Sequence, residues 1–500
     1  MPLENPLPSV HTRATPGPAP GGLGRGLFAS TTIKVGEDVL NITSPFVAVL
    51  DTPRLSDTCS GCLGSGPFHH SGPLKNCTGC KVVKYCDREC QRKDWKFAHA
   101  HECAIFKNLN PRILPSNARA LLRMIVRTAH KKYTNGELEL FSQLETHISE
   151  IRDQSPEQWE RIALSSKAVK AYSGTDMKEE TISAFGAKLE LNSFNFTNIL
   201  SDRIGLYLHP YAALINHSCN YNAAVTFDSD NLYIKATRPI QKGDQIFISY
   251  IDATNPVKLR RSELRERYYF DCHCAKCAKD LTVPEHSFLG PEAQDDLSAL
   301  EGAEIEAYEL LNECSSAVET DPKKTAKRLR SSIKFLRKVG AWPVTEQPLV
   351  SLRDELIASL LADQDIGSGF VQAAVRYLRV DPVVYGDERH PVRQLHAYAL
   401  ARVAVSLDYG EDGDSAGLLG LVDVRMEPVL LAWSVLSRLV ELEDEACTVP
   451  SFKTMVRWLF DDVNERFKGD KKKPEDRGDD IRREWEKIEL LVDRALEKGY

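Results

Sequence analysis

The sequence predicts an α+β protein built from several domains, and three observations along its 500 residues support this. Between residues 24 and 50, and again between 223 and 251, apolar and polar residues alternate in short runs bounded by turn residues, which is typical of β-strands. From about residue 281 onward, apolar residues recur almost continuously at helical spacing. Eleven of the thirteen cysteines belong to two tight clusters with one added residue, Cys219, a pattern that indicates metal-bound modules.

Length and charge divide the chain into two parts. The whole chain has a net charge of −7, but residues 281–500 carry 29 Lys and Arg against 42 Asp and Glu, a net charge of −13. The first 280 residues carry a net charge of +6, so we expect two parts with different surfaces. No apolar run approaches the roughly 18 residues of a membrane span, and the N-terminus lacks a signal pattern, so we expect neither membrane insertion nor secretion. The clustered cysteines are then reduced ligands rather than disulfides, while Cys314 and Cys447 are expected to be core residues.

The first cluster supplies seven thiols and one imidazole. Its members are Cys59, Cys62, Cys77, Cys80, Cys86, Cys90, His99 and Cys103. Eight ligands suffice for two tetrahedral Zn²⁺ ions, and filled coordination shells leave no position for a substrate, which predicts structural sites. His69, His70 and His101 are competing imidazoles, but the spacing of three residues to Cys103 favours His99.

The second cluster supplies three thiols, from Cys272, Cys274 and Cys277. A tetrahedral zinc site needs a fourth ligand, and Cys219 is available. The sequence therefore predicts three Zn²⁺ ions per chain.

Three short strings carry a further signal. The string "GLGRGLFA" contains Gly24, Arg25 and Gly26 at a predicted strand and turn, and "LINHSCNYN" places Asn216 and His217 just before Cys219. The string "FISYID" places Tyr250 at the end of a predicted strand, ahead of the second cluster. Together with "KYC" and "CQRKDW" in the first cluster, this order resembles the SET-and-MYND (SMYD) family of protein lysine methyltransferases. The resemblance covers about residues 20–280, and more weakly "HPVRQL" at 390–395.

The resemblance implies how the chain is organised. It predicts a β-rich SET core with an inserted MYND zinc finger, a helical insert, a post-SET zinc segment and an all-α, tetratricopeptide-like C-terminal domain. The expected boundaries are 1–57 for the N-terminal part of the SET domain, 58–104 for the MYND finger, 105–185 for the helical insert, 186–252 for the core SET region, 253–280 for the post-SET segment and 281–500 for the helical domain. Within the finger, the family pairs its ligands by interleaving. One zinc is expected on Cys59, Cys62, Cys86 and Cys90, and the other on Cys77, Cys80, His99 and Cys103.

The resemblance also implies an activity, the S-adenosylmethionine-dependent transfer of a methyl group to the side-chain amine of a lysine in a protein substrate. Tyr250 and Tyr268 are the expected catalytic residues, Tyr250 orienting the amine and Tyr268 lining the lysine channel. The expected cofactor-binding residues are Gly24, Arg25, Gly26, His147, Asn192, Asn216, His217, Tyr250 and Phe270. The chemistry suits such a site, because methyl transfer depends on positioning, and the amine, with an unperturbed pKa of about 10.4, loses its proton more readily in a desolvated channel.

Departures from the family pattern leave the substrate preference open. Tyr221 stands where "D-P-N" is usual, and Gln245 where "G-E-E" is usual. A histone tail is one candidate substrate, since the acidic second half would attract a basic segment. A proline-rich peptide is the expected partner of the finger, the protein is expected to be a monomer, and its expected location is the cytoplasm, the nucleus or both. One alternative function is a catalytically silent adaptor built on the finger and the helical scaffold. A second alternative, a nucleic-acid binder, ranks last because the chain lacks a strong basic face.

Overall fold

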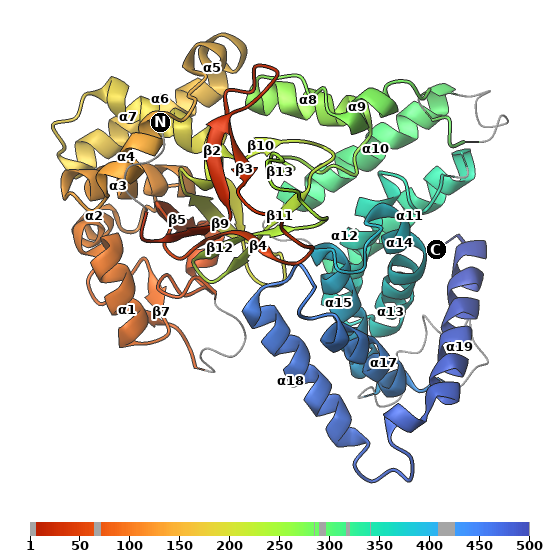
Figure 1. Cartoon of the computed structure of the whole chain (residues 1–500). Helices are drawn as coiled ribbons and strands as arrows, with labels where there is room; N and C mark the ends of the chain where they lie inside the picture. Colours follow the sequence, from red (N-terminus) through yellow and green to blue (C-terminus); the bar gives the residue numbers. More distant parts are fainter. Residues whose placement is uncertain are drawn as a thin grey trace. The chain divides into compact units, whose positions relative to one another are not determined.

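A computed structural model describes residues 7–64, 72–284, 286–289, 297–316, 321–340, 342–408 and 426–499. The chain divides into two units, whose elements carry the labels of Figure 1. The β-rich unit consists of Met1–Ile251, Arg261–Cys274 and Cys447–Phe452. The helical unit consists of Asp252–Arg260, Ala275–Ala446 and Lys453–Tyr500.

Short strands form several small sheets in the β-rich unit. The largest is antiparallel in the order β1 (Val10–Thr12), β4 (Asp38–Ile42), β12 (Asn231–Ala236), β11 (Ala223–Asp228). The next contains β5 (Val47–Leu50), β9 (Arg203–Leu208) and β8 (Phe194–Thr197), again antiparallel. Two-stranded antiparallel pairs are β2 (Ala14–Pro18) with β3 (Arg25–Ala29), and β6 (Lys75–Asn76) with β7 (Lys84–Tyr85). These strands confirm the β-rich core that the alternating pattern predicts.

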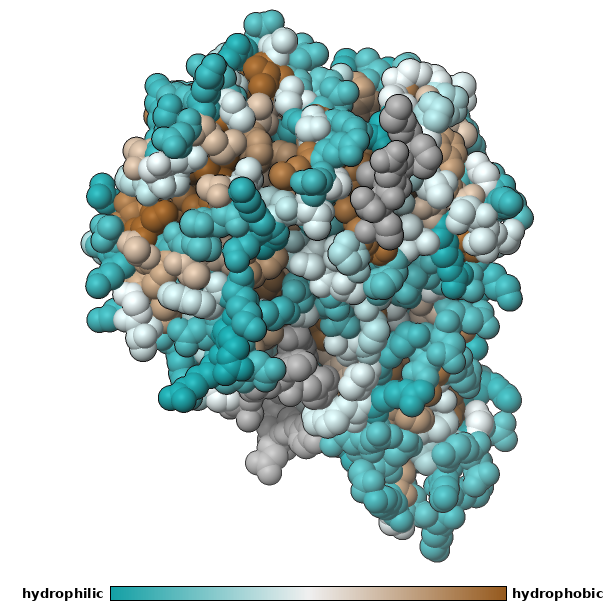
Figure 2. Space-filling model, turned by 60° about the vertical axis from the view of Figure 1, so that its left-hand side comes forward, coloured by the Kyte–Doolittle hydropathy of each residue, from teal (hydrophilic) through white to brown (hydrophobic). Residues whose placement is uncertain are grey.

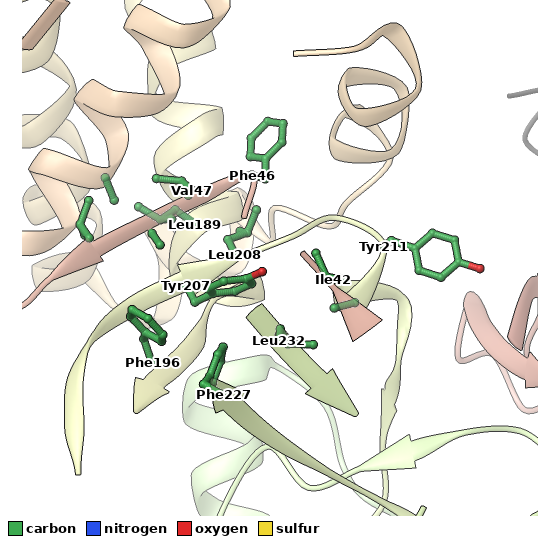
Figure 3. Close-up of a cluster of buried hydrophobic side chains, with 14 of the residues drawn as sticks. Ile42, Phe46, Val47, Leu189, Phe196, Tyr207, Leu208, Tyr211, Phe227 and Leu232 are labelled. Atoms are coloured by element: carbon green, nitrogen blue, oxygen red, sulfur yellow. The ribbon is translucent and has the colours of Figure 1, made fainter. Parts of the chain in front are cut away.

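The core between these sheets is aromatic. Phe227 of β11 lies with its ring centroid 5.0 Å from that of Phe196 of β8 and 5.1 Å from that of Tyr207 of β9 (Figure 3). Ile42 and Leu232, which are paired across β4 and β12, are buried beside them. On the face drawn in Figure 2, hydrophilic residues cover most of the surface, and hydrophobic ones appear in small patches between them.

Helices surround the sheets of the β-rich unit. They are α1 (Arg88–Asp94), α2 (Ala100–Leu109), α3 (Ser116–Ala129), α4 (Asn135–Ser142), α5 (Ile148–Gln154), α6 (Pro156–Ser173) and α7 (Glu179–Asn192). Helix α4 begins with a capping box, in which Thr134 and Glu137 satisfy each other's backbone N–H groups. The sequence pattern predicts helical structure through "ELFSQLETHISEI". This prediction is wrong for the middle of the segment. The chain leaves the helix after Ser142 and restarts at Ile148, and His147, just before the restart, has a left-handed backbone with φ of 44°.

The helical unit confirms the helices predicted after residue 281 within the described residues. They are α10 (Leu297–Ser316), α11 (Pro322–Gly340), α12 (Leu349–Ala362), α13 (Ile366–Val375), α14 (Asp381–Val384), α15 (Pro391–Asp408), α17 (Pro428–Glu441), α18 (Pro450–Arg466) and α19 (Gly478–Glu497). Leu300, Leu329, Trp342 and Leu352 are buried in one of its cores, against which Cys314 packs. The tetratricopeptide-like arrangement stays a prediction. Among the helices described, none is both long and apolar enough to cross a membrane.

A C-terminal segment, Cys447–Phe452, belongs to the β-rich unit. The buried thiol of Cys447 donates to the carbonyl of Ala236 at 3.2 Å, which confirms it as a core residue. Ser451 donates to the carboxylate of Asp228 from its backbone at 2.9 Å and from its hydroxyl at 2.6 Å. These bonds fasten the segment to β11 and β12.

A pair of short parallel strands joins two segments of the β-rich unit that lie far apart in the sequence. Strand β10 (Asn216–His217) pairs in parallel with β13 (Phe247–Ile248). The side chain of Asn222 stabilises this strand pair. Its amide donates to the carbonyl of Gln245 at 2.9 Å, and its oxygen accepts from the N–H of Phe247 at 2.8 Å. Because the strands are only two residues long, a side chain supplies bonds that a longer sheet would supply from its backbone.

We predict that Asn222→Ala destabilises the protein by about 1–3 kcal/mol, because the half-buried carbonyl of Gln245 and N–H of Phe247 lose the partner that Asn222 gives them. Chemical denaturation of the zinc-loaded protein measures this change. The control is Asn135→Ala at the exposed start of α4, which should change stability by less than about 0.5 kcal/mol. Equal stability of Asn222→Ala and the wild type would contradict the role given to Asn222.

Candidate functional site

A cavity of about 410 Å³ in the β-rich unit collects residues from six distant stretches of the sequence. Its lining includes Gly24, Arg25, His147, Asn192, Asn216, His217, Tyr250, Tyr268 and Phe270, which are the predicted site residues except Gly26. Apolar walls come from Leu191, Ala213 and Leu214. The structure therefore brings together residues that are up to 246 positions apart in the chain.

Two glycines shape the first wall for different reasons. Gly24 has a φ of 68°, in the left-handed region that favours glycine. Gly26 is not among the lining residues, and a Cβ atom added to it would lie 2.5 Å from Nε2 of Gln245 and 3.1 Å from Nδ2 of Asn216. The amide of Asn216 donates to the carbonyl of Arg25 at 2.9 Å, which fixes this turn against β10. The guanidinium of Arg25 in turn donates to Gln143, a lining residue that the sequence did not point to.

His217 links the two paired strands through its ring. Its Nδ1 accepts the backbone N–H of Tyr250 at 3.0 Å, so in the neutral ring the proton lies on Nε2. That Nε2 is 3.3 Å from Sγ of Cys219, close enough to donate to a thiolate. The ring also lies 5.3 Å from the ring of Tyr250 and 5.9 Å from that of Phe270, measured between centroids. His217 thus positions Tyr250, Phe270 and Cys219 together.

Tyr250 and Tyr268 form a pair with ring centroids 5.0 Å apart. The hydroxyl of Tyr250 donates to the carbonyl of Ile215 at 2.6 Å, and that of Tyr268 to the carbonyl of Tyr250 at 3.4 Å. Burial raises the pKa of both phenols above the ordinary value. Both hydroxyls are therefore neutral near pH 7, so they serve as oriented dipoles rather than as bases.

A second cavity of about 260 Å³ is also lined by this pair. It shares five lining residues with the first cavity, namely Leu191, Asn192, Ala213, Tyr250 and Tyr268. Strand β8 lines it with Phe194, Asn195 and Thr197, and Arg267 is its only charged residue in the described part of the chain. The tyrosine pair is therefore a shared wall between two adjoining cavities.

The end of α7 and the segment between α4 and α5 supply another wall. The amide of Asn192, at the end of α7, donates to the carbonyl of Lys188 at 2.8 Å and to that of Glu145 at 3.2 Å. The ammonium of Lys188 donates to the carbonyl of Phe141 at 2.8 Å and to that of Ser142 at 2.6 Å. These bonds hold the segment between α4 and α5 against the cavity. Sequence reasoning missed Lys188, since a lysine within a helical pattern gives no signal of burial.

The first cysteine cluster has the geometry that zinc requires. Four sulfur atoms about 2.3 Å from a tetrahedral Zn²⁺ are about 3.8 Å apart. Sγ of Cys62 is 3.8 Å from that of Cys86, and Sγ of Cys77 is 3.8 Å from that of Cys103. The groups that can each hold a metal ion are Cys59, Cys62, Cys86 and Cys90, and Cys77, Cys80, His99 and Cys103. This is the interleaved pairing that the resemblance implies.

His99 is the imidazole of this cluster. Its Nε2 is 3.4 Å from Sγ of Cys77 and 3.7 Å from Sγ of Cys80. It ends a π-helical turn (Trp95–His99), a widened turn that often marks a functional site. The competing His101 instead stacks on His130, with centroids 3.6 Å apart. The other two competing histidines, at positions 69 and 70, lie outside the described residues.

A buried charge network ties this metal group to the core. Nδ1 of His99 is 3.8 Å from the carboxylate of Glu102, and that carboxylate accepts two bonds of 2.7 Å from Arg123 of α3. Burial alone would raise the pKa of Glu102, but the charge and hydrogen bonds of Arg123 lower it to about 2. Arg123 also donates to Asp94 at 3.2 Å and to the carbonyl of Ala48 in β5 at 3.0 Å. A carboxylate behind a ligating histidine fixes the orientation of its ring.

The third group consists of Cys219, Cys272, Cys274 and Cys277. Their sulfur atoms all lie within 4.8 Å of one another, as in the other two groups, so this group can also hold a metal ion. Four thiolates are a donor set that suits Zn²⁺. Cys219 lies two residues after His217 and Cys272 two residues after Phe270, so this group adjoins the first cavity on both segments.

Comparisons with known proteins match the sequence of this chain to a family. A family model of the SET domain matches residues 24–251. Histone-lysine N-methyltransferase SMYD3 of Mus musculus is 30% identical over 297 residues, which cover 57% of this chain and 67% of that protein. N-lysine methyltransferase SMYD2 of Gallus gallus is 30% identical over 276 residues, which cover 52% of this chain and 61% of that protein. A crystal structure of the SET domain of LSMT bound to lysine and AdoHcy aligns over 95% of this chain and 94% of that chain, at 12% identity and a TM-score of 0.25.

We predict that metal analysis of the purified protein finds about three zinc atoms per chain. Cys219→Ser should lower the value to about two, because the third group loses one of its four ligands. Cys314→Ser is the control, since Cys314 belongs to none of the groups, and it should keep about three. A wild-type value of two or fewer, or no difference between the variants, would contradict the assignment.

Proposed function

The chain belongs to the SET-and-MYND (SMYD) family of protein lysine methyltransferases, and we propose that it methylates lysine at its two adjoining cavities, with S-adenosylmethionine as the methyl donor. The observation that carries this proposal is the tyrosine pair in the shared wall. Tyr250 and Tyr268 contact both cavities, so a cofactor in one and a lysine side chain in the other would meet beside them.

The first cavity suits the cofactor chemically. S-adenosylmethionine has a flat adenine ring and a charged amino-acid portion, and when bound it supplies a methyl group carried on a positively charged sulfur. Phe270 offers an aromatic face for the ring, and His217 lies against Phe270. Asn192, Asn216 and the backbone around Gly24 and Arg25 offer polar groups for the other end. These residues would hold the group.

The second cavity suits the lysine. Ile215, Val225, Phe227 and Ile248 give it apolar walls for the four-carbon stem, and it leads to the tyrosine pair. An amine at this depth is desolvated, which lowers its pKa and favours the neutral, nucleophilic form. The proton of Tyr250 is committed to the carbonyl of Ile215, so its hydroxyl oxygen is free to accept an N–H of the amine. Tyr250 would thus aim the nitrogen lone pair toward the first cavity.

The metal groups would support this site without taking part in the reaction. We assign the first two groups to a closed MYND finger, whose filled coordination shells leave no position for a substrate. The third group is assigned to a post-SET zinc, which would hold the segment carrying Tyr268 and Phe270 against His217. The finger also offers a surface for a proline-rich peptide, supported by Trp95, which is 44% exposed in the π-helical turn.

We predict that Tyr250→Phe lowers methyl transfer by about 100-fold, because the amine loses the group that orients it. Labelled-methyl transfer to a panel of histones and to cell extract measures the change. Tyr172→Phe is the control, since Tyr172 lies exposed near the far end of α6. Equal labelling by Tyr250→Phe and the wild type would refute the role of Tyr250. If calorimetry found no binding of S-adenosylmethionine to the zinc-loaded wild type, a catalytically silent adaptor would be the better assignment.

The acidic second half of the chain supports a basic protein segment, such as a histone tail, as the substrate. We predict that raising the ionic strength from 50 to 300 mM raises KM for a Lys- and Arg-rich peptide several-fold, because salt screens long-range attraction. The control is a peptide with the same target lysine between neutral residues, whose KM should change little. If KM of both peptides responded equally, the acidic charge would have no part in substrate attraction.

A further inference from the structure

Tyr269 occupies a backbone position that a side chain normally avoids. It follows the last residue of α8 (Val257–Tyr268) and has a φ of 61°, in the left-handed region where helices commonly end with glycine. A tyrosine there is strained by its Cβ atom. Such strain persists only where contacts from the surrounding structure hold the residue in place. Residues of this kind cluster at functional sites.

The side chain of Tyr269 contacts the helical insert at several points. Its hydroxyl lies 3.2 Å from the hydroxyl of Ser155 and donates to Oε1 of Gln158, also at 3.2 Å. Its ring packs against the buried apolar cluster of Ile151, Ile162, Ala187 and Leu191. Tyr269 therefore connects the end of α8 to helices α5 and α6.

The ring also faces His147, with centroids 5.5 Å apart. His147 has a left-handed backbone too, with a φ of 44°, at the start of α5. Two strained residues, one from each segment, thus meet in a single contact. His147 lines the first cavity, and so do Tyr268 and Phe270 on either side of Tyr269.

The contact therefore joins two walls of the same cavity. One wall is the segment that carries Tyr268 and Phe270, and the other is the segment before α5 that carries Glu145 and His147. Tyr269 itself does not line the cavity but points into the insert. Separating the walls would break two hydrogen bonds of a half-buried hydroxyl and release the strain at both ends.

We propose that Tyr269 is a positioning residue that clasps the two walls of the cofactor cavity, and that the clasp sets how tightly and for how long the cofactor is held. This inference rests on the proposed function, in which the first cavity binds S-adenosylmethionine. A strained clasp with few bonds suits this task, because a segment that must open to exchange a ligand needs a closed state only moderately favoured over the open one.

Tyr269→Gly separates the clasp from a purely structural role. Glycine adopts a φ of 61° without strain, so the substitution removes the ring and the hydroxyl of Tyr269 while it relieves the backbone. The clasp, however, would be lost. We expect the dissociation constant and the dissociation rate of S-adenosylhomocysteine to rise about tenfold or more, while KM for the peptide stays within about twofold. Calorimetry, stopped-flow fluorescence and steady-state kinetics measure these quantities on the zinc-loaded, full-length protein.

Tyr269→Phe tests the hydroxyl alone and keeps the ring. It should raise the same two constants by a smaller factor, and so should Gln158→Ala. The double variant should show less than the product of the single effects, because both single changes remove the same hydrogen bond. Tyr172→Ala, near the other end of α6, is the control and should leave cofactor binding unchanged.

Unchanged cofactor affinity and dissociation rate in Tyr269→Gly, with a wild type that binds the cofactor and transfers methyl groups, would overturn the clasp alone. An equal loss of cofactor affinity and peptide affinity, together with a lower melting temperature in Tyr269→Phe, would also overturn it in favour of a structural role. A wild type that binds no S-adenosylmethionine would overturn the proposed function, and the clasp with it.

Discussion

The parallel pairing of β10 with β13 is the constraint on which the site depends. It places Asn216 and His217 beside the strand that ends just before Tyr250, although 33 residues separate His217 from Tyr250. Both strands are too short to hold their register by backbone bonds alone. Asn222 and His217 therefore supply side-chain bonds to the backbone of the partner segment, at Phe247 and Tyr250. This strand pair connects the tyrosine pair, both cavities and the third cysteine group.

Groups that can hold metal ions, together with buried charges, add to the hydrophobic core where short segments contribute little apolar surface. The first cysteine cluster spans only 45 residues, too few to bury much apolar surface on their own. It connects to the sheets through Glu102 and Arg123, a bidentate pair that is buried on both sides. Such a pair is costly to break, because either charge alone would remain buried without compensation. The first cysteine cluster is thus fixed to α3 and β5 more rigidly than a surface contact would allow.

Several site residues could be predicted from the sequence, and others could not, for identifiable reasons. Cysteine spacing predicts both interleaved groups, because ligand chemistry constrains which residues can serve. Lys188, Arg123 and Tyr269 gave no comparable signal. A lysine or arginine at helical spacing is typical of a solvated face, yet Lys188 and Arg123 are buried because backbone carbonyls or carboxylates from other segments meet them. Tyr269 matters through its backbone conformation, which no residue pattern announces.

By itself the sequence determined the chemistry of this protein. It specified the thiol and imidazole ligands, the aromatic and amide residues around Tyr250, the helices after residue 281 and the difference in charge between the two halves. Only the tertiary structure decided which of these residues meet. It placed Tyr250 and Tyr268 in a wall shared by two cavities, packed Gly26 closely against Gln245 and Asn216, and broke the predicted helix between Ser142 and Ile148. The physical reason is that spacing along a chain fixes local geometry, whereas contacts between distant segments depend on packing and on buried hydrogen bonds, which only the folded chain supplies.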